Sequence, residues 1–224
     1  MNYYDKSLFL RLLPFNVRHL LSRYCPVGVR GNFQLIDYGN FTKHFHYDCT
    51  ERRMCNDALI TLTCNILYYH GNLMHSAHIQ SFCLSYDKRK VIAAGKHQWY
   101  VFNQYGVLEK TIPMRLVATA LVAQRNGNII AASCNTRSIM VFNFDFKLVY
   151  DIHCNNPLHL ATNSLNQLVV LRIDAITLFT ERYVMVAHFL FPCTFRKRKS
   201  SLCVDEIGQI FVHDFKNNKT FYFQ

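Results

Sequence analysis

The sequence predicts an all-β fold built from repeated units of about 40 residues. Short apolar and β-branched runs alternate with polar turns along most of the 224 residues, which is typical of strands. Two windows, residues 126–143 and 207–224, align without a gap, and Gly127 then matches Gly208, 81 positions further on. A spacing of this size corresponds to two units. Half of the residues are hydrophobic and 14% are aromatic, which excludes a disordered chain.

The clearest unit predicts four consecutive strands joined by short polar turns. Its strands are expected at residues 81–85, 91–94, 99–102 and 107–112, and a turn at 87–90 separates the first two. The other units follow the same order of strands, but fewer of their turns carry the typical turn residues. Each unit should therefore form one four-stranded antiparallel sheet.

The chain holds six predicted pairs of second and third strands. They are centred near residues 20/35, 60/67, 92/101, 130/141, 169/178 and 211/222. Six units of about 37 residues come close to the length of four-stranded propeller blades. The last unit ends at its third strand, and we expect Asn2–Tyr4 to supply the fourth and close the ring. We therefore predict an all-β fold, a β-propeller of about six four-stranded blades forming a single domain over residues 1–224.

One alternative concerns the N-terminal part of the chain. Leucines spaced as in a helix between Ser7 and Tyr24 indicate a short helix ahead of a five-bladed, open or incomplete ring. The same segment also resembles the start of an F-box.

The units resemble NHL repeats. The pattern Asn126–Ser133, followed by Asn135, Arg137 and Ile139–Phe142, fits the family's turn, strand, loop and strand, and Asp205–Asp214 fits its first half. The resemblance implies a propeller that works as a binding platform. Members of the family serve in RNA-binding translational regulators, in substrate recognition by ubiquitin ligases, and in a few lyases and extracellular enzymes. A lyase would need metal-binding His and Asp positions that this sequence does not match.

Charge narrows the choice of partner. The chain has 25 Lys and Arg against 14 Asp and Glu, a net charge of +11, which favours an anionic partner. The loops from second to third strand and from one unit to the next should share one end of the sheets. Most of the basic excess is expected there. The candidate nucleic-acid-binding residues at this end are Arg52, Arg53, Lys96, His97, Arg115, Asn135, Arg137, Arg196, Lys197, Arg198, Lys199 and Lys216.

These residue types predict single-stranded RNA as the ligand. Cations neutralise phosphates, amides contact base edges, and exposed aromatic or imidazole rings stack on bases. Trp99 starts a strand and is expected in the core. Basic loops that only solubilise, or a localisation patch at Arg196–Lys199, are the simpler alternatives. The alternative functions are a protein-interaction scaffold or ubiquitin-ligase substrate receptor that docks an acidic protein, and a degenerate copy that has lost its site.

Catalytic and metal-binding patterns are weak. A group of possible ligands has spacings that match no compact zinc motif: Cys49, Cys55, Cys64, His70, His75 and His78. Nucleophile-elbow, P-loop and dinucleotide fingerprints do not occur. We therefore expect no enzyme activity, metal or cofactor. The sequence shows no signal peptide and no run of about 18 apolar residues, and its nine cysteines are irregularly spaced. A protein of the cytoplasm or nucleus, without a membrane partner, is expected.

Overall fold

The computed structural model describes residues 49–55, 58–63, 66–69, 72–75, 78–191, 194–196, 200–205, 208–214 and 219–223. This part of the chain forms five antiparallel sheets. The first contains β1 (Cys49–Cys55), β2 (Ala58–Thr63), β3 (Ile66–Tyr69) and β4 (Asn72–His75). The second contains β5 (Ser81–Leu84), β6 (Lys90–Ala94), β7 (Gln98–Asn103) and β8 (Leu108–Pro113).

The remaining sheets follow in chain order. The third contains β9 (Ala120–Ala123), β10 (Ile129–Ser133), β11 (Ser138–Phe142) and β12 (Leu148–His153). The fourth contains β13 (Pro157–Thr162), β14 (Leu168–Arg172), β15 (Ala175–Phe179) and β16 (Met185–Leu190). The fifth contains β17 (Ser200–Val204), β18 (Ile210–Asp214) and β19 (Lys219–Phe223).

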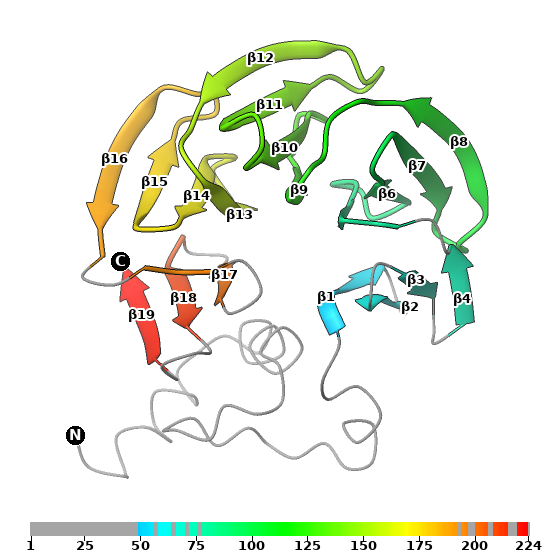
Figure 1. The fold of residues 1–224 in the computed structure, drawn as a ribbon, viewed down its shortest axis with the longest axis horizontal. Helices are drawn as coiled ribbons and strands as arrows, with labels where there is room; N and C mark the ends of the chain where they lie inside the picture. The colour runs from blue at the N-terminus through cyan, green and yellow to red at the C-terminus, as the bar shows by residue number, and fades with distance from the viewer. Residues whose placement is uncertain are drawn as a thin grey trace, which may run out of the picture.

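The sheets follow one another around a common centre (Figure 1). β9 and β13 lie toward the centre, whereas β8, β12 and β16 run along the perimeter. The first strands of neighbouring sheets contact each other, β1 with β5, β5 with β9, β9 with β13 and β13 with β17. The fold is a β-propeller, as the repeats predicted.

The predicted pairs of second and third strands are confirmed in register for four sheets. The structure pairs Ile92 with Val101, Ile130 with Val141, Val169 with Leu178 and Phe211 with Tyr222. The pair predicted near 60/67 is β2 with β3. The sixth pair near 20/35, the closing strand at Asn2–Tyr4 and the alternative helix over Ser7–Tyr24 lie outside the described residues.

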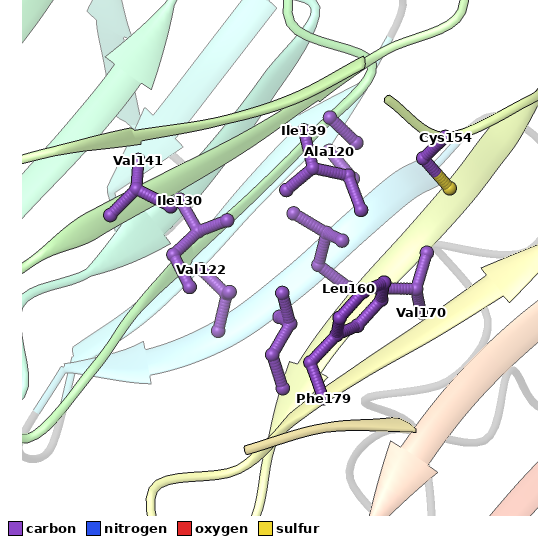
Figure 2. Close-up of a cluster of buried hydrophobic side chains, with 11 residues drawn as sticks. Ala120, Val122, Ile130, Ile139, Val141, Cys154, Leu160, Val170 and Phe179 are labelled. Atoms are coloured by element: carbon purple, nitrogen blue, oxygen red, sulfur yellow. The ribbon is translucent and has the colours of Figure 1, made fainter. Parts of the chain in front are cut away.

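The second strands of the second, third and fourth sheets are mostly apolar because these sheets pack on both faces. In β10, Ile130 and Ala132 contact the fourth sheet, whereas Ile129 and Ala131 contact the second. Figure 2 shows the first of these cores, in which Ile130 and Val141 of the third sheet lie with Leu160, Val170 and Phe179 of the fourth. Continuous apolar strands are expected wherever both faces of a sheet are covered. No described strand pairs with the outer side of β8, β12 or β16, and most of their side chains are exposed.

In the second to fifth sheets, the described turns from first to second and from third to fourth strand share one geometry. In the turn at 124–128, the Gln124 amide donates to the Asn128 carbonyl (2.8 Å) and the Gly127 amide donates to the Gln124 carbonyl (3.0 Å). The fourth turn residue takes a positive φ in each case, and these residues are Lys88, Gly106, Gly127, Phe146, Asn166, Tyr183 and Gly208. This is a type I turn followed by one left-handed residue. Four of these seven residues are not glycine, so glycine marked fewer than half of these turns in the sequence.

Gly127 offers a clean test of this turn. A Cβ atom there would meet nothing within 4 Å, so the cost of Gly127→Ala comes from the φ of +86° alone. We expect about 1 kcal/mol lower free energy of unfolding in urea. Gly127→Asn should cost less, because Asn166 takes the same position in the next sheet with a φ of 61°. Equal losses for both variants would contradict the role assigned to φ.

Candidate nucleic-acid interface

The loops that join second to third strands, and each sheet to the next, lie at one end of the sheets. We call this end the loop rim. Its described loops are residues 78–80, 95–97, 114–119, 134–137, 154–156, 173–174, 191 and 194–196. We call the opposite end, with the hairpin turns, the turn rim. The antiparallel order of every sheet alternates the connections between these two ends.

Two loops bring Lys96, His97 and Arg115 to the same part of the loop rim. The Gly95 amide donates to the Gln98 carbonyl (2.9 Å), which closes a tight connection between β6 and β7. The Met114 amide donates to the His97 carbonyl (3.1 Å), so the loop after β8 passes beside it. Lys96, His97 and Arg115 are all exposed.

The corresponding loop of the third sheet carries Asn135 and Arg137. Both side chains are exposed, and Arg137 has a φ of 53°, in the left-handed region. The Thr136 amide donates to Ser133 Oγ (3.4 Å), and the Arg137 carbonyl accepts from the Cys154 amide (2.8 Å). Bonds on both sides of the loop therefore fix its backbone while Asn135 and Arg137 project into solvent.

Arg196 is the last of the described candidates on the loop rim. The neighbouring Phe195 is buried, and its amide donates to the Ile173 carbonyl (2.6 Å). The Arg196 carbonyl accepts from Ser200 Oγ (2.8 Å), and its side chain is exposed. Lys197, Arg198, Lys199 and Lys216 lie outside the described residues.

Arg52 and Arg53 are not loop residues, and that prediction is wrong. They lie inside β1, where Arg52 pairs with Thr61 and Arg53 with Ile60 of β2. The run Glu51–Arg52–Arg53 is polar enough to indicate a loop, but pairing with an apolar neighbouring strand draws it into the sheet. β-strands tolerate such residues because their packing, more than intrinsic propensity, decides where a strand forms.

The loop rim carries more uncompensated positive charge than the turn rim. Among the described residues, its cations are Lys96, Arg115, Arg137, Arg196 and, at the end of β14, Arg172, against the carboxylates of Asp174 and, at the end of β18, Asp214. Within the same residues the turns carry Lys88, Arg89, Arg125, Lys147 and Arg182 against Asp87, Asp145, Glu181 and Asp205. The two rims therefore carry similar numbers of cations, and they differ mainly in the number of carboxylates.

Most of the loop-rim cations form no ion pair with a described carboxylate and are therefore available to an external anion. Arg172 approaches Asp174, with Nη2 3.7 Å from Oδ1, and donates from Nε to the Asn155 carbonyl (3.1 Å). Lys96, Arg115, Arg137 and Arg196 form no ion pair with any described residue. Four exposed cations without carboxylate partners can neutralise phosphates.

Aromatic rings are distributed differently from the charges. Trp99 is completely buried, with its ring centroid 5.1 Å from that of Phe142, which confirms the core position expected from the sequence. His78, His97 and His153 are exposed rings at the loop-rim ends of their strands or in its loops, and Phe215 lies outside the described residues. Exposed aromatic side chains occur in the turns, at Tyr86, Tyr105 and Phe144, and in the perimeter strands, at Tyr150 and Phe189.

These turn aromatics were missed at the sequence level. Aromatic residues usually indicate the core. The signal that could have found them is their position, one or two residues after the polar residue that starts a turn, as in Ser85–Tyr86 and Asn143–Phe144.

The buried thiol of Cys154 is a poor nucleophile. Burial raises the pKa of the Cys154 thiol to about 11, so at neutral pH it is protonated and weakly nucleophilic. The described residues contain no group of three or more His, Cys, Asp and Glu side chains that could hold a metal ion. Within that same part, no helix has the length and apolar character of a membrane span.

Comparisons with known proteins agree on the fold. No protein-family model matches the chain, and a search of curated protein sequences finds no match to it. Among solved structures, it resembles the Pan2 WD40 domain of Neurospora crassa, with 15% identity, 78% of this chain and 64% of that one covered, and a TM-score of 0.55. It also resembles Kuenenia stuttgartiensis hydrazine synthase, with 10% identity, 70% and 52% coverage and a TM-score of 0.56.

A third similar structure is BBS1N, solved in complex with ARL6DN. The identity is 12%, the match covers 70% of this chain and 60% of that one, and the TM-score is 0.53. The chain thus spans between half and two thirds of the length of these three solved chains. They support a propeller in general and do not single out the NHL type.

Proposed function

We propose that this chain is a non-enzymatic, NHL-like binding platform that holds single-stranded RNA against its loop rim. The observation that carries the proposal is the set of four exposed cations without carboxylate partners among the described residues, at Lys96, Arg115, Arg137 and Arg196. Lys96, Arg115 and Arg137 lie in loops of the second and third sheets and between them, and Arg196 lies between the fourth and fifth sheets. An extended polyanion along the rim can therefore contact several at once. His97 and Asn135, exposed in the same loops, supply a ring and an amide for bases.

The thiols fit a reducing compartment. Cys134 and Cys154 carry no disulfide. Disulfides are rare in the cytoplasm and nucleus, where most RNA-binding proteins work, and we propose this location.

Salt dependence tests the proposal directly. Fluorescence anisotropy with a labelled random-sequence single-stranded RNA, repeated at rising salt, should give an affinity that falls steeply. Four phosphate contacts correspond to a slope of roughly −3 for log K against log salt, because each contributes about 0.7 in single strands. Absence of binding at low salt, or binding indifferent to salt, would contradict RNA as the ligand.

A second candidate function is a protein-interaction scaffold, and β16 is the observation that favours it. β16 pairs with β15 on one side, and no described strand pairs with its other side. Its sequence, MVAHFL, has no charged residue, yet Met185 is 59% and Leu190 73% exposed. An edge strand of this kind can accept an extended apolar segment of a partner protein.

A charge placed on this edge should block such pairing. We expect Val186→Lys to reduce concentration-dependent light scattering while changing the free energy of unfolding by less than about 0.5 kcal/mol, because Val186 is exposed. The matched control is Leu108→Lys in β8, whose strand already carries Glu109 and Lys110. Equal scattering for Val186→Lys and the unaltered protein would remove the support that β16 gives to a scaffold.

A further inference from the structure

The seam between the second and third sheets carries an aromatic and cationic cluster on the turn rim. The Arg125 guanidinium carbon lies 5.8 Å from the centroid of the Tyr86 ring. The Lys90 ammonium lies 5.7 Å from the centroid of the Phe144 ring. Tyr86 and Lys90 come from the second sheet, and Arg125 and Phe144 come from the third. We call these four residues the seam cluster.

The rings of the seam cluster remain open to solvent. Tyr86 is 57% and Phe144 69% exposed, so each cation covers only part of its ring. Large apolar rings with this exposure lose water readily when another flat group stacks on them. The exposure therefore points to a ligand with planar faces.

Hydrogen bonds hold both turns in place before any ligand arrives. Beside Tyr86, Ser85 Oγ donates to Asp87 Oδ1 (2.6 Å) and accepts from the Lys90 amide (2.9 Å). Beside Phe144, Asn143 Oδ1 accepts from the amides of Asp145 (3.0 Å) and Lys147 (2.9 Å). Ordered turns spare a ligand part of the entropy cost of binding.

The charge around the seam cluster favours an anionic ligand. In the described turns and strands of this seam, the cations are Lys88, Arg89, Lys90, Lys110, Arg125 and Lys147, and the acids are Asp87, Glu109 and Asp145. Lys90 already pairs with Glu109 at 3.5 Å, and Asp87 is occupied by Ser85 and the Arg89 amide. Planar faces beside a cationic excess are what single-stranded nucleic acids use.

We infer that the seam cluster is a second contact for single-stranded RNA, in which bases stack on Tyr86 and Phe144 while Arg125 and Lys90 stand beside their phosphates. The inference rests on the proposed function, because it assumes the same ligand class. The two contacts recognise different parts of the RNA. The loop rim binds chiefly phosphates, whereas the seam cluster requires bases.

The experiment separates these contributions with two probes. One is fluorescein-labelled single-stranded hexauridylate, and the other is an abasic hexamer with the same phosphodiester backbone. Their affinities are measured by anisotropy for the unaltered protein, for the double variant Tyr86→Ala with Phe144→Ala, and for Tyr86→Phe with Phe144→Tyr. Tyr105→Ala is the matched control, since Tyr105 is an equally exposed turn aromatic.

Removal of the two rings should weaken hexauridylate binding tenfold or more, since base stacking on aromatic rings dominates such contacts. Binding of the abasic probe should not change, and Tyr86→Phe with Phe144→Tyr should keep the affinity for hexauridylate. Tyr105→Ala should have less than a twofold effect.

Three results would overturn the inference. If the double alanine variant binds hexauridylate as tightly as the unaltered protein does, the seam cluster has no role. If both probes weaken equally, the contact is not through bases. In either case, a loss of affinity on replacing Lys96 and Arg137 would leave the proposed function standing. If the unaltered protein binds neither probe at low salt, both the inference and the proposed function are wrong.

Discussion

Replacement of Lys96 and Arg137 together by alanine is expected to weaken binding of single-stranded RNA roughly tenfold or more at low salt. Both side chains are exposed on the loop rim and neither has a carboxylate partner among the described residues. Each change removes one phosphate contact, so the slope of log K against log salt should fall by about 1.4 in total. The loss should be similar for RNAs of different sequence, because phosphates carry no base information.

The matched control is Arg182→Ala. Arg182 is also an exposed arginine in a connection, but it lies on the turn rim beside Glu181. Removing it changes the net charge by one without touching the loop rim, and we expect less than a twofold effect. An effect of Arg182→Ala as large as that of the double variant would mean that RNA responds to net charge alone and that the loop rim is not the site.

Replacement of Trp99 by alanine should lower the free energy of unfolding by about 3–5 kcal/mol. The side chain is completely buried and packs edge-to-face against Phe142 (5.1 Å) and Phe146 (6.3 Å), between the second and third sheets. The variant would leave a cavity between two sheets that are held together mainly by such contacts. Urea unfolding followed by circular dichroism measures the loss, since Trp99 is the single tryptophan of the chain and its removal abolishes tryptophan fluorescence.

Trp99→Phe separates packing from hydrogen bonding. The indole Nε1 is buried and has no hydrogen-bond partner among the described residues. A phenyl ring keeps most of the contacts and removes this unsatisfied donor, so the loss should stay below about 2 kcal/mol. A loss as large as that of Trp99→Ala would show that the indole N–H makes a stabilising bond.

The strands that the sequence predicted best are those buried on both faces. The second strands, such as Val91–Ala94 and Leu168–Leu171, are continuous apolar runs because two neighbouring sheets cover them. The third strands follow after short loops, so the pairing of Ile130 with Val141 could be placed by alignment alone. Because the same order of strands recurs in each unit, the sequence predicted a propeller of repeated sheets.

The perimeter strands were harder to interpret from sequence. The run from Val184 to Phe191 is as apolar as a core strand, yet most of it is exposed, because no described strand or sheet covers the outer side of β16. Exposure there depends on position in the propeller, which local composition does not encode. The strand at Arg52 and Arg53 shows the reverse case, a polar run that pairs within a sheet.

The positions of the charged residues of the candidate site could be predicted from the sequence, but the exposure of its aromatic side chains could not. Once strands were assigned, alternation of the connections put Lys96, Arg115, Arg137 and Arg196 at one end of the sheets. The aromatic component could not be predicted, since whether Tyr86 or Phe144 is exposed depends on which turn residue points outward. Both turns contain a residue with positive φ, Lys88 or Phe146, and because neither is glycine the sequence does not reveal the turn geometry.

The most direct test of RNA binding at the loop rim is photo-crosslinking of the full chain to a 4-thiouridine-substituted single-stranded RNA, with the attached peptides identified by mass spectrometry. If RNA binds at the loop rim, we expect crosslinks in the loops at residues 95–97 and 134–137, where His97 and Asn135 are exposed beside Lys96 and Arg137. These crosslinks should disappear at high salt and in the variant lacking both cations. Crosslinks confined to segments away from these loops, under conditions in which the RNA is bound, would contradict binding at the loop rim.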